Sequence, residues 1–303
     1  MNPQFIMDGL IAGALIGLGA IGVTLTYSIL RFANFAHGEF LSWGAYLALA
    51  ISGSIGFLSA NLTKPIAPFS FGWSLPIAAL LAVLLTGVLA LALDAVLFGR
   101  LRSRGGAVII LVMASFGASL ALRSLLEFLF TSKPAYYTKA LQIAVRLGGG
   151  LRATPDQLLV LGVTLVVVIA IHLLLTRSEI GRSMRAVSEN PALAGIAGID
   201  VRRIIRFVWF IGAALACIAG IMTGLLVQIR PYLGHDLLLP LFAAAILGGI
   251  GSVPGAMIAG LIVGLSEAAA VQLVGAEWRA AVSFVILVLV LLLRPRGLFG
   301  RPA

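Results

Sequence analysis

The stretch RFANFAHGEF, residues 31–40, gathers groups capable of proton transfer and hydrogen bonding between two apolar segments. These groups are the side chains of Asn34, His37 and Glu39. His37 and Glu39 form an HxE pair, which could supply two ligands to a metal ion. His172 and His235 are expected near opposite faces of the bilayer, so neither offers an evident third ligand. The chain also lacks an HExxH motif or a Ser/His/Asp arrangement. We therefore predict no metal, no other cofactor and no catalytic residue in this chain.

The composition is that of an integral membrane protein. The chain has 303 residues, of which 61% are hydrophobic and only 11% are charged, and its mean hydropathy is +1.12. Several apolar runs have the length of about 20 residues that a helix needs to cross a bilayer. The short alternating pattern of a membrane β-barrel is absent from the sequence. We expect one all-α transmembrane domain over residues 1–303, a polytopic bundle of eight or nine spans.

The uncertainty between eight and nine spans comes from one short segment. It runs into GGIGSVPG, residues 248–255, where glycines and a proline interrupt the helix. Such a break is tolerated in a membrane where protein or a water-filled cavity satisfies the backbone. We therefore predict a broken or re-entrant helix near 248–255, with Gly249, Gly251 and Pro254 on a translocation path or gate. The nine apolar segments are Asp8–Leu30, Phe40–Ser59, Ser74–Phe98, Val108–Phe130, Gln157–Thr176, Phe207–Ile229, Leu237–Gly249, Gly255–Val274 and Trp278–Leu293.

Basic residues predict the orientation in the membrane. The formal net charge of +10 would suggest nucleic acid as a partner of a soluble protein, but here the arginines cluster in short loops. One side of the predicted path holds 13 basic residues and the other holds 7. By the positive-inside rule the first side is cytoplasmic, which places the N-terminus outside and the C-terminus inside. The 13 are Arg31, Arg100, Arg102, Arg104, Arg177, Arg182, Arg185, Arg202, Arg203, Arg206, Arg294, Arg296 and Arg301; the 7 are Lys64, Lys133, Lys139, Arg146, Arg152, Arg230 and Arg279.

The longest cytoplasmic loop, residues 177–206, contains signals for a short helix. Asn190 is a good N-cap and Pro191 suits the first helical position. Gly198 can adopt the left-handed conformation that ends a helix, so residues 191–197 should form about two turns. Asp200 can then cap the sixth span. The short helix has little apolar moment for resting on lipid, and we expect it to dock on a protein.

Three stretches resemble a known family. The loop RAVSENPALAGIAGIDVRR resembles the coupling loop of ABC-importer permeases, in which a short helix docks into a groove of an ATPase subunit. The stretches LTYSILRFANFAHGEFLSWGAYLAL and LLLPLFAAAILGGIGSVPGAMIAGLIVGL resemble LivH-type permeases of branched-chain amino-acid ABC transporters. On this resemblance the ATPase-coupling residues are Ala186, Glu189, Asn190, Pro191, Ala192, Leu193, Gly195 and Gly198.

The resemblance implies an assembly in the inner membrane of a bacterial-type cell. Two ATPase subunits would bind on the cytoplasmic side, and an external binding protein would deliver the amino acid. The second membrane subunit would be a homologous permease or a second copy of this chain. Independently, none of the three lysines follows a glycine, so the sequence has no GxxxxGK[ST] phosphate loop. ATP would have to be hydrolysed by the partners.

Two other functions remain to be weighed. Asn190, Pro191 and Ala192 form the tripeptide of aquaporin-like channels, which suggests a passive pore for small neutral solutes. That fold uses two such triplets inside the membrane, whereas this chain has one, among arginines. The resemblance also implies that initial selectivity resides in the external binding protein, so a permease for amides or urea with the same membrane architecture stays an alternative.

The motif at residues 31–40 is also a candidate gate. Gly38 allows a turn that could bring Asn34, His37 and Glu39 together. At the aqueous boundary these groups would simply be solvated, whereas between helices they must bond one another or line a wet cavity. The resemblance favours the second case, with Asn34, His37, Gly38 and Glu39 on the translocation path and His37 paired with Glu39.

Three further charges fall inside apolar segments. Arg123 and Glu127 are four residues apart on one helix and could form an ion pair. Asp94 is expected near the membrane interface. Glu267 is deeper, and we expect it at a cavity or a subunit interface.

Overall fold

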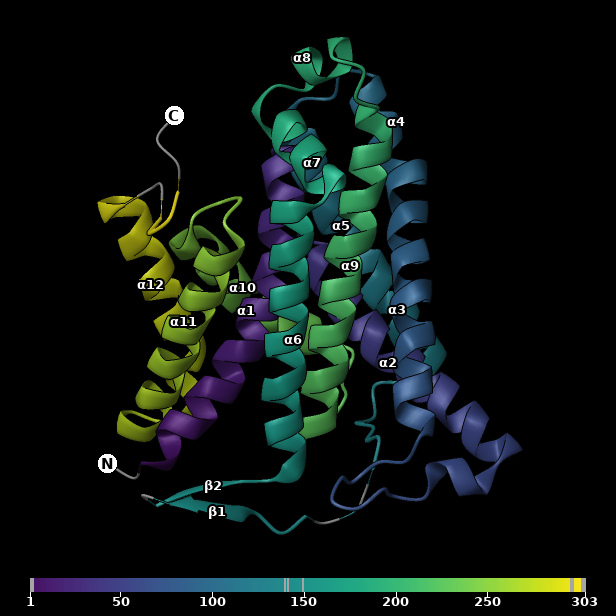
Figure 1. Ribbon diagram of the computed structural model, residues 1–303, viewed down its shortest axis with the longest axis vertical. Coiled ribbons are helices and arrows are strands. Elements are labelled where there is room, and N and C mark those ends of the chain that lie inside the picture. The colour runs from purple at the N-terminus through teal and green to yellow at the C-terminus, as the bar shows by residue number, and fades with distance from the viewer. Residues whose placement is uncertain (1–2, 139, 141, 149, 295–296, 301–303) are drawn as a thin grey trace.

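The computed structural model describes residues 3–138, 140, 142–148, 150–294 and 297–300. Of the basic residues counted for orientation, Lys139, Arg296 and Arg301 lie outside this part of the chain. The structure is a helical bundle with one small β-hairpin (Figure 1). The helices are α1 (Gln4–Leu30), α2 (His37–Leu58), α3 (Ser74–Leu93), α4 (Gly99–Ser103), α5 (Val108–Phe130), α6 (Pro155–Arg177), α7 (Glu179–Glu189), α8 (Pro191–Ile196), α9 (Val201–Leu226), α10 (Leu233–Gly248), α11 (Val253–Leu273) and α12 (Arg279–Leu293).

Eight helices of the described chain are long and apolar enough to cross a membrane. One of them, Ser74–Ser103, combines α3 and α4 through a π-helical segment at Asp94–Phe98. Another, Ala276–Leu293, adds a short 3-10 turn to α12. The seventh apolar segment, Leu237–Gly249, lies in α10, which at 16 residues is a shorter helix. The prediction of a polytopic all-α membrane protein is confirmed.

The two ends of the bundle differ. At one end the short helix α8 projects beyond the long helices, and at the other lies the hairpin of β1 (Val145–Gly148) and β2 (Leu151–Ala153) (Figure 1). We call these the α8 end and the hairpin end. The hairpin is antiparallel, with Val145 opposite Ala153. Its strands alternate apolar and basic residues over only three positions each, 145–147 and Leu151–Ala153, and the sequence analysis did not predict them.

Helix α1 runs through the interior and is packed closely against α11. A Cβ atom added to Gly13 would lie 2.7 Å from Cα of Leu261, and one added to Gly264 would lie 2.3 Å from the backbone nitrogen of Gly13. Real Cβ atoms do not approach this closely, so only glycine permits this helix separation. The small residues spaced by four along both helices therefore serve close packing.

Helix α2 begins deep inside the bundle, not at its end. A Cβ atom added to Gly22 would lie 2.8 Å from Cε1 of His37 and 2.9 Å from the carbonyl oxygen of Gly212. Gly22 and Gly212 lie well inside the long helices α1 and α9. The six residues between α1 and α2 therefore carry the chain back into the bundle, and the polar start of α2 is at mid-depth.

Helix α10 also begins at this depth and abuts the start of α2. A Cβ atom added to Gly234 would lie only 1.8 Å from the carbonyl oxygen of Gly38. The hydroxyl of Ser42 accepts a hydrogen bond from the Gly234 amide at 2.9 Å and donates one to the Pro231 carbonyl at 3.0 Å. The first turns of the two helices are thus joined through backbone contact and one buried serine.

The break near 248–255 is a tight turn between α10 and α11. Gly249 and Gly251 have φ values of 90° and 88°, which glycine adopts without strain. Ser252 caps α11 by accepting a hydrogen bond from the Gly255 amide. The backbone amide of Leu298 donates to the carbonyl of Leu247, so the C-terminal segment satisfies one of the orphan carbonyls at the end of α10.

Candidate functional site

The motif residues are buried where α2 begins. Asn34 is 4% exposed, and His37 and Glu39 are each 1% exposed. The Oδ1 atom of Asn34 accepts a hydrogen bond from the Ala36 amide at 3.1 Å, which stabilises the turn into α2. The alternative of a solvated surface turn is therefore wrong: the motif folds back between helices.

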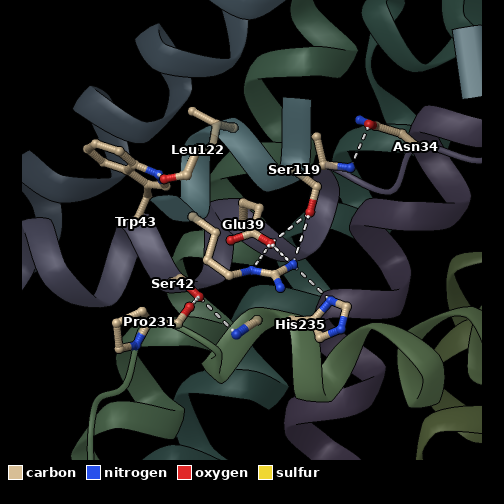
Figure 2. A network of polar contacts seen from close by, with 11 residues as sticks. Asn34, Glu39, Ser42, Trp43, Ser119, Leu122, Pro231 and His235 are labelled. Atoms are coloured by element: carbon tan, nitrogen blue, oxygen red, sulfur yellow. Dashed lines mark hydrogen bonds and ion pairs between the residues drawn. The ribbon is translucent and has the colours of Figure 1, made fainter. Parts of the chain in front are cut away.

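Glu39 is paired with α5, not with His37. Its Oε1 atom accepts hydrogen bonds from the Ser119 hydroxyl at 2.8 Å and from Nη2 of Arg123 at 3.0 Å (Figure 2). Arg123 is 8% exposed. The expected pairs His37–Glu39 and Arg123–Glu127 are both wrong. The buried carboxylate of Glu39 is neutralised by Arg123 of the neighbouring helix α5, more than 80 residues away in sequence.

His37 instead contacts α1. Its ring packs on Gly22 and forms a hydrogen bond with the backbone of Gly19. Within the described part of the chain, Nε2 of His37, Nδ2 of Asn34 and Oε2 of Glu39 have no hydrogen-bond partner. Three unpartnered polar atoms within one buried turn are costly, at roughly 1–3 kcal/mol each.

The network continues from Arg123 to the start of α10. Nη2 of Arg123 lies 2.9 Å from Nδ1 of His235, and its guanidinium carbon lies 5.0 Å from the centroid of the Tyr232 ring. Arginine only donates hydrogen bonds, so Nδ1 of His235 is the acceptor. Figure 2 shows Ser119, Glu39 and His235 around this contact. We call Glu39, Ser119, Arg123, Tyr232 and His235 the polar centre.

A cavity of about 660 Å³ opens at the α8 end. It is lined by Arg31, by Glu189 of α7, and by Gly251 and Pro254 of the α10–α11 turn. Nη2 of Arg31 donates a hydrogen bond to the carbonyl of Ser188 on α7. The structure therefore brings part of the predicted coupling set beside Gly251 and Pro254. The start of α2 does not line this cavity.

The predicted coupling residues lie together. Ala186 and Glu189 are on α7, Asn190 is the N-cap of α8, and Pro191, Ala192, Leu193 and Gly195 form α8 itself. The Asn190 side chain accepts from the Leu193 amide at 3.0 Å, and Gly198 has a φ of 86°. The predicted helix and both of its terminal signals are confirmed, and α8 ends one residue earlier than expected, at Ile196.

Two other buried carboxylates have partners that the sequence did not reveal. Asp94 is 7% exposed and its Oδ1 atom lies 2.6 Å from Nη2 of Arg102, while its position near the membrane interface stays a prediction. Glu267 is 1% exposed, bonds Nε of Arg279 at 2.7 Å and lines a cavity of about 350 Å³ near the start of α1. Among the described residues, no group of three or more His, Cys, Asp or Glu could hold a metal ion.

Comparison with known proteins identifies the family. The family described as the permease component of branched-chain amino acid transport systems matches residues 5–291. The chain belongs to this permease family. The high-affinity branched-chain amino acid transport system permease protein BraD of Pseudomonas aeruginosa is 33% identical over 99% of this chain and 96% of its own length. The permease protein LivH of Escherichia coli K12 is 31% identical over 100% of this chain and 98% of its own.

More distant similarities are partial or structural. The autoinducer 2 import system permease LsrD of Klebsiella pneumoniae is 33% identical over 42% of this chain. A chain of the solved structure of PsaBC from Streptococcus pneumoniae in complex with Fab has a TM-score of 0.51 and covers 97% of this chain and 93% of its own. At 13% identity that similarity shows the fold alone. The protein is thus a membrane transport permease and not an enzyme, and the passive channel gains no support.

Sequence reasoning missed most of the polar centre. It treated Arg123 as a local partner of Glu127, and it used His235 only to argue against a metal. The available signal was that Glu39 and Arg123 are opposite charges in different apolar segments, which must be neutralised in a membrane. Their pairing follows from the inward fold of residues 31–36, which no local pattern predicts.

Proposed function

We propose that this permease is the membrane subunit of an ATP-driven importer of branched-chain amino acids. The observation that carries the proposal is full-length similarity to BraD and LivH, whose names specify that transport system. The alternative of an amide or urea permease finds no comparable match among these relatives. The substrate would pass by alternating access, with the membrane helices moved by separate ATPase subunits.

The assembly requires partners that supply energy and substrate. The chain has no phosphate loop, so we assign ATP hydrolysis to two ATPase subunits. An external binding protein would deliver the amino acid, and a homologous permease or a second copy would complete the path in the inner membrane. No cofactor is assigned to this chain itself. We place the α8 end in the cytoplasm, because the basic loops gather on that side, and the N-terminus outside.

We assign ATPase docking to α8. Its side chains Leu193 and Ile196 are 65% and 86% exposed. Two large apolar residues on a projecting helix fit an apolar groove of a partner protein. The N-cap at Asn190 and the glycine at 198 fix both ends of α8, so the helix can transmit a displacement that a loose loop would absorb.

We assign the gate to the start of α2. Asn34, His37, Gly38 and Glu39 lie at mid-depth, where the first turns of α2 and α10 meet. Arg31 connects this segment to Ser188 of α7, next to α8. A movement of α7 can therefore pull the segment 31–36, which leads directly into the buried turn. Gly249, Gly251 and Pro254 would form the cytoplasmic side of the path.

Reconstituted transport tests the proposal. The tagged chain is purified with its associated subunits and placed in proteoliposomes with the external binding protein. Radiolabelled leucine should accumulate only when ATP reaches the ATPase side, and acetamide and urea should not. Equal leucine entry with and without ATP would instead indicate a passive pore, and accumulation of urea alone would reassign the substrate.

A further inference from the structure

Exposed charged side chains lie at the start of α10, close to the buried Arg123 of α5. Asp236 and Arg230 have 55% and 48% of their side chains exposed. Both belong to the segment that enters α10, and His235 between them is also exposed. We call Arg230, Tyr232, His235 and Asp236 the α10 entry patch.

The depth of the patch follows from its neighbours. His235 contacts Arg123, which lies within the long helix α5, and the adjacent Gly234 abuts Gly38 at mid-depth. Asp236 is the next residue along α10, in its first turn. Charged groups within a membrane span face a water-filled cavity or another subunit and avoid lipid. The α10 entry patch therefore faces water or protein.

The acid and the base of the patch form an ion pair but no hydrogen bond. Nη2 of Arg230 and Oδ2 of Asp236 are 3.9 Å apart, which is too long for a hydrogen bond. Each group keeps its hydrogen-bonding capacity for another molecule. A ligand with one cationic and one anionic end could bond both, its cation to Asp236 and its anion to the planar fork of Arg230.

We propose that the α10 entry patch binds the zwitterionic head group of the transported amino acid. The α-ammonium group pairs with Asp236 and the α-carboxylate pairs with Arg230, while the exposed ring of Tyr232 offers an apolar surface beside them. Binding both charges at once offsets the cost of bringing a zwitterion to this depth, because each charge exchanges water for an opposite charge. The inference rests on the proposed function, since it names the part of the path that recognises the substrate.

The position of the patch suits an intermediate binding site for the substrate on the translocation path. Arg123 links it directly to Glu39 and so to the buried turn of the gate. A substrate at Asp236 and Arg230 would lie next to His235 and Tyr232, which the patch shares with the polar centre. The substrate would then move from the patch to the polar centre by exchanging one ion pair for another, and no isolated charge would be exposed to lipid.

Protection of a cysteine from modification tests this site. Tyr232→Cys places a thiol two residues from Arg230 and four residues from Asp236 along the chain, and the native Cys217 is buried and should not react. A charged methanethiosulfonate reagent is applied to the assembled complex with and without leucine. At a leucine concentration ten times its Kd, the rate of modification should fall about tenfold. Leucinamide, which lacks the carboxylate, and isocaproate, which lacks the ammonium group, should protect far less.

Matched variants distinguish binding at the patch from a nonspecific effect of removing a charged side chain. Asp236→Asn and Arg230→Gln should each abolish protection by leucine, whereas Glu277→Gln, which removes an exposed carboxylate elsewhere, should preserve it. Val227→Cys, also exposed, provides a second reporter if Tyr232→Cys does not fold. Equal protection by all three compounds, or none by leucine, would overturn the proposal. A thiol that reacts in the isolated chain but not in the complex would reassign the patch to a subunit interface.

Leucine uptake measured on the same parental preparation keeps the two proposals apart. Normal ATP-driven uptake without protection would reject the zwitterion site and leave the importer intact. Protection without any leucine uptake would reject the importer.

Discussion

Glu39 illustrates which residue-level features the sequence predicts. Its type and its apolar surroundings indicate that it must be neutralised if it is buried, and the structure places it at 1% exposure with a charged partner. The identity of that partner was not predictable, because Arg123 approaches from another helix. His37, the nearest candidate along the chain, points to α1 instead. Local spacing therefore predicts that a buried Glu39 must be neutralised, but it does not predict that Arg123 is the residue that neutralises it.

The buried ion pair predicts a specific pattern of stability. Glu39→Gln leaves the charge of Arg123 without its counter-ion and should reduce the free energy of unfolding by about 3 kcal/mol. The double variant Glu39→Gln, Arg123→Met removes both charges and should be more stable than Glu39→Gln alone. Thermal unfolding of the detergent-purified protein measures both, with Glu277→Gln as the exposed control. A double variant less stable than the single would contradict this view of the pair.

At the scale of elements, helix α8 was predictable and the hairpin was not. Asn190, Pro191 and Gly198 are local signals, and each acts within a few residues of the helix that it bounds. Helix α7 is capped by Ser178, whose hydroxyl accepts a hydrogen bond from the Gly181 amide at 3.0 Å, but the sequence analysis interpreted this segment only as a loop. The inward start of α2, at His37 instead of Phe40, depends on packing against Gly22 and Gly212, which lie far away in sequence.

The close contact between the starts of α2 and α10 predicts that adding a single methyl group at Gly234 prevents the two helices from packing. Gly234→Ala would place its Cβ atom 1.8 Å from the Gly38 carbonyl oxygen, so the two helices must separate. The variant should lose most of its folded protein in detergent extracts. Gly117→Ala on α5 is the control, because nothing lies within 4 Å of an added Cβ atom there. Equal yields and melting temperatures for both variants would refute the close contact.

Helix α8 predicts a variant that folds but does not couple. Gly195 is exposed with nothing within 4 Å of an added Cβ atom, so Gly195→Trp should leave the bundle intact. The indole would obstruct a docking groove, and both co-purification of ATPase subunits and leucine uptake should fall severalfold. Gly162→Trp, at a similarly open position on α6, should affect neither. Normal assembly and normal uptake with Gly195→Trp would remove α8 from the docking surface.

At the scale of the whole molecule, composition predicts the class and the number of spans but not their arrangement. Apolar length defines a transmembrane helix, so eight of the nine apolar segments proved to be candidate spans and only the shortest did not. Which helix lies in the interior depends on small residues along α1 and α11. The two inward helix starts depend on contacts between segments about 200 residues apart.

The orientation predicts an asymmetric labelling pattern. Ser132, which is exposed after α5, should react as a cysteine with a membrane-impermeant maleimide applied to intact cells. Ala192→Cys on α8 should react only after the membrane is permeabilised. Ala192 suits this test better than the half-buried Ser188. The buried native Cys217 should not contribute. The reverse pattern would invert the assignment of the α8 end to the cytoplasm.

The central claim, that substrate crosses the bundle past the buried start of α2, is tested most directly by one transport rate. His37→Ala removes a ring whose Nε2 atom has no partner among the described residues, and it leaves the Glu39–Arg123 pair in place. The measurement is the initial rate of ATP-driven leucine uptake per folded complex in proteoliposomes. We expect at least about a tenfold fall, equal to about 1.4 kcal/mol in the barrier, with membrane insertion and ATPase attachment unchanged. Uptake at the parental rate would show that the motif is a structural turn away from the path.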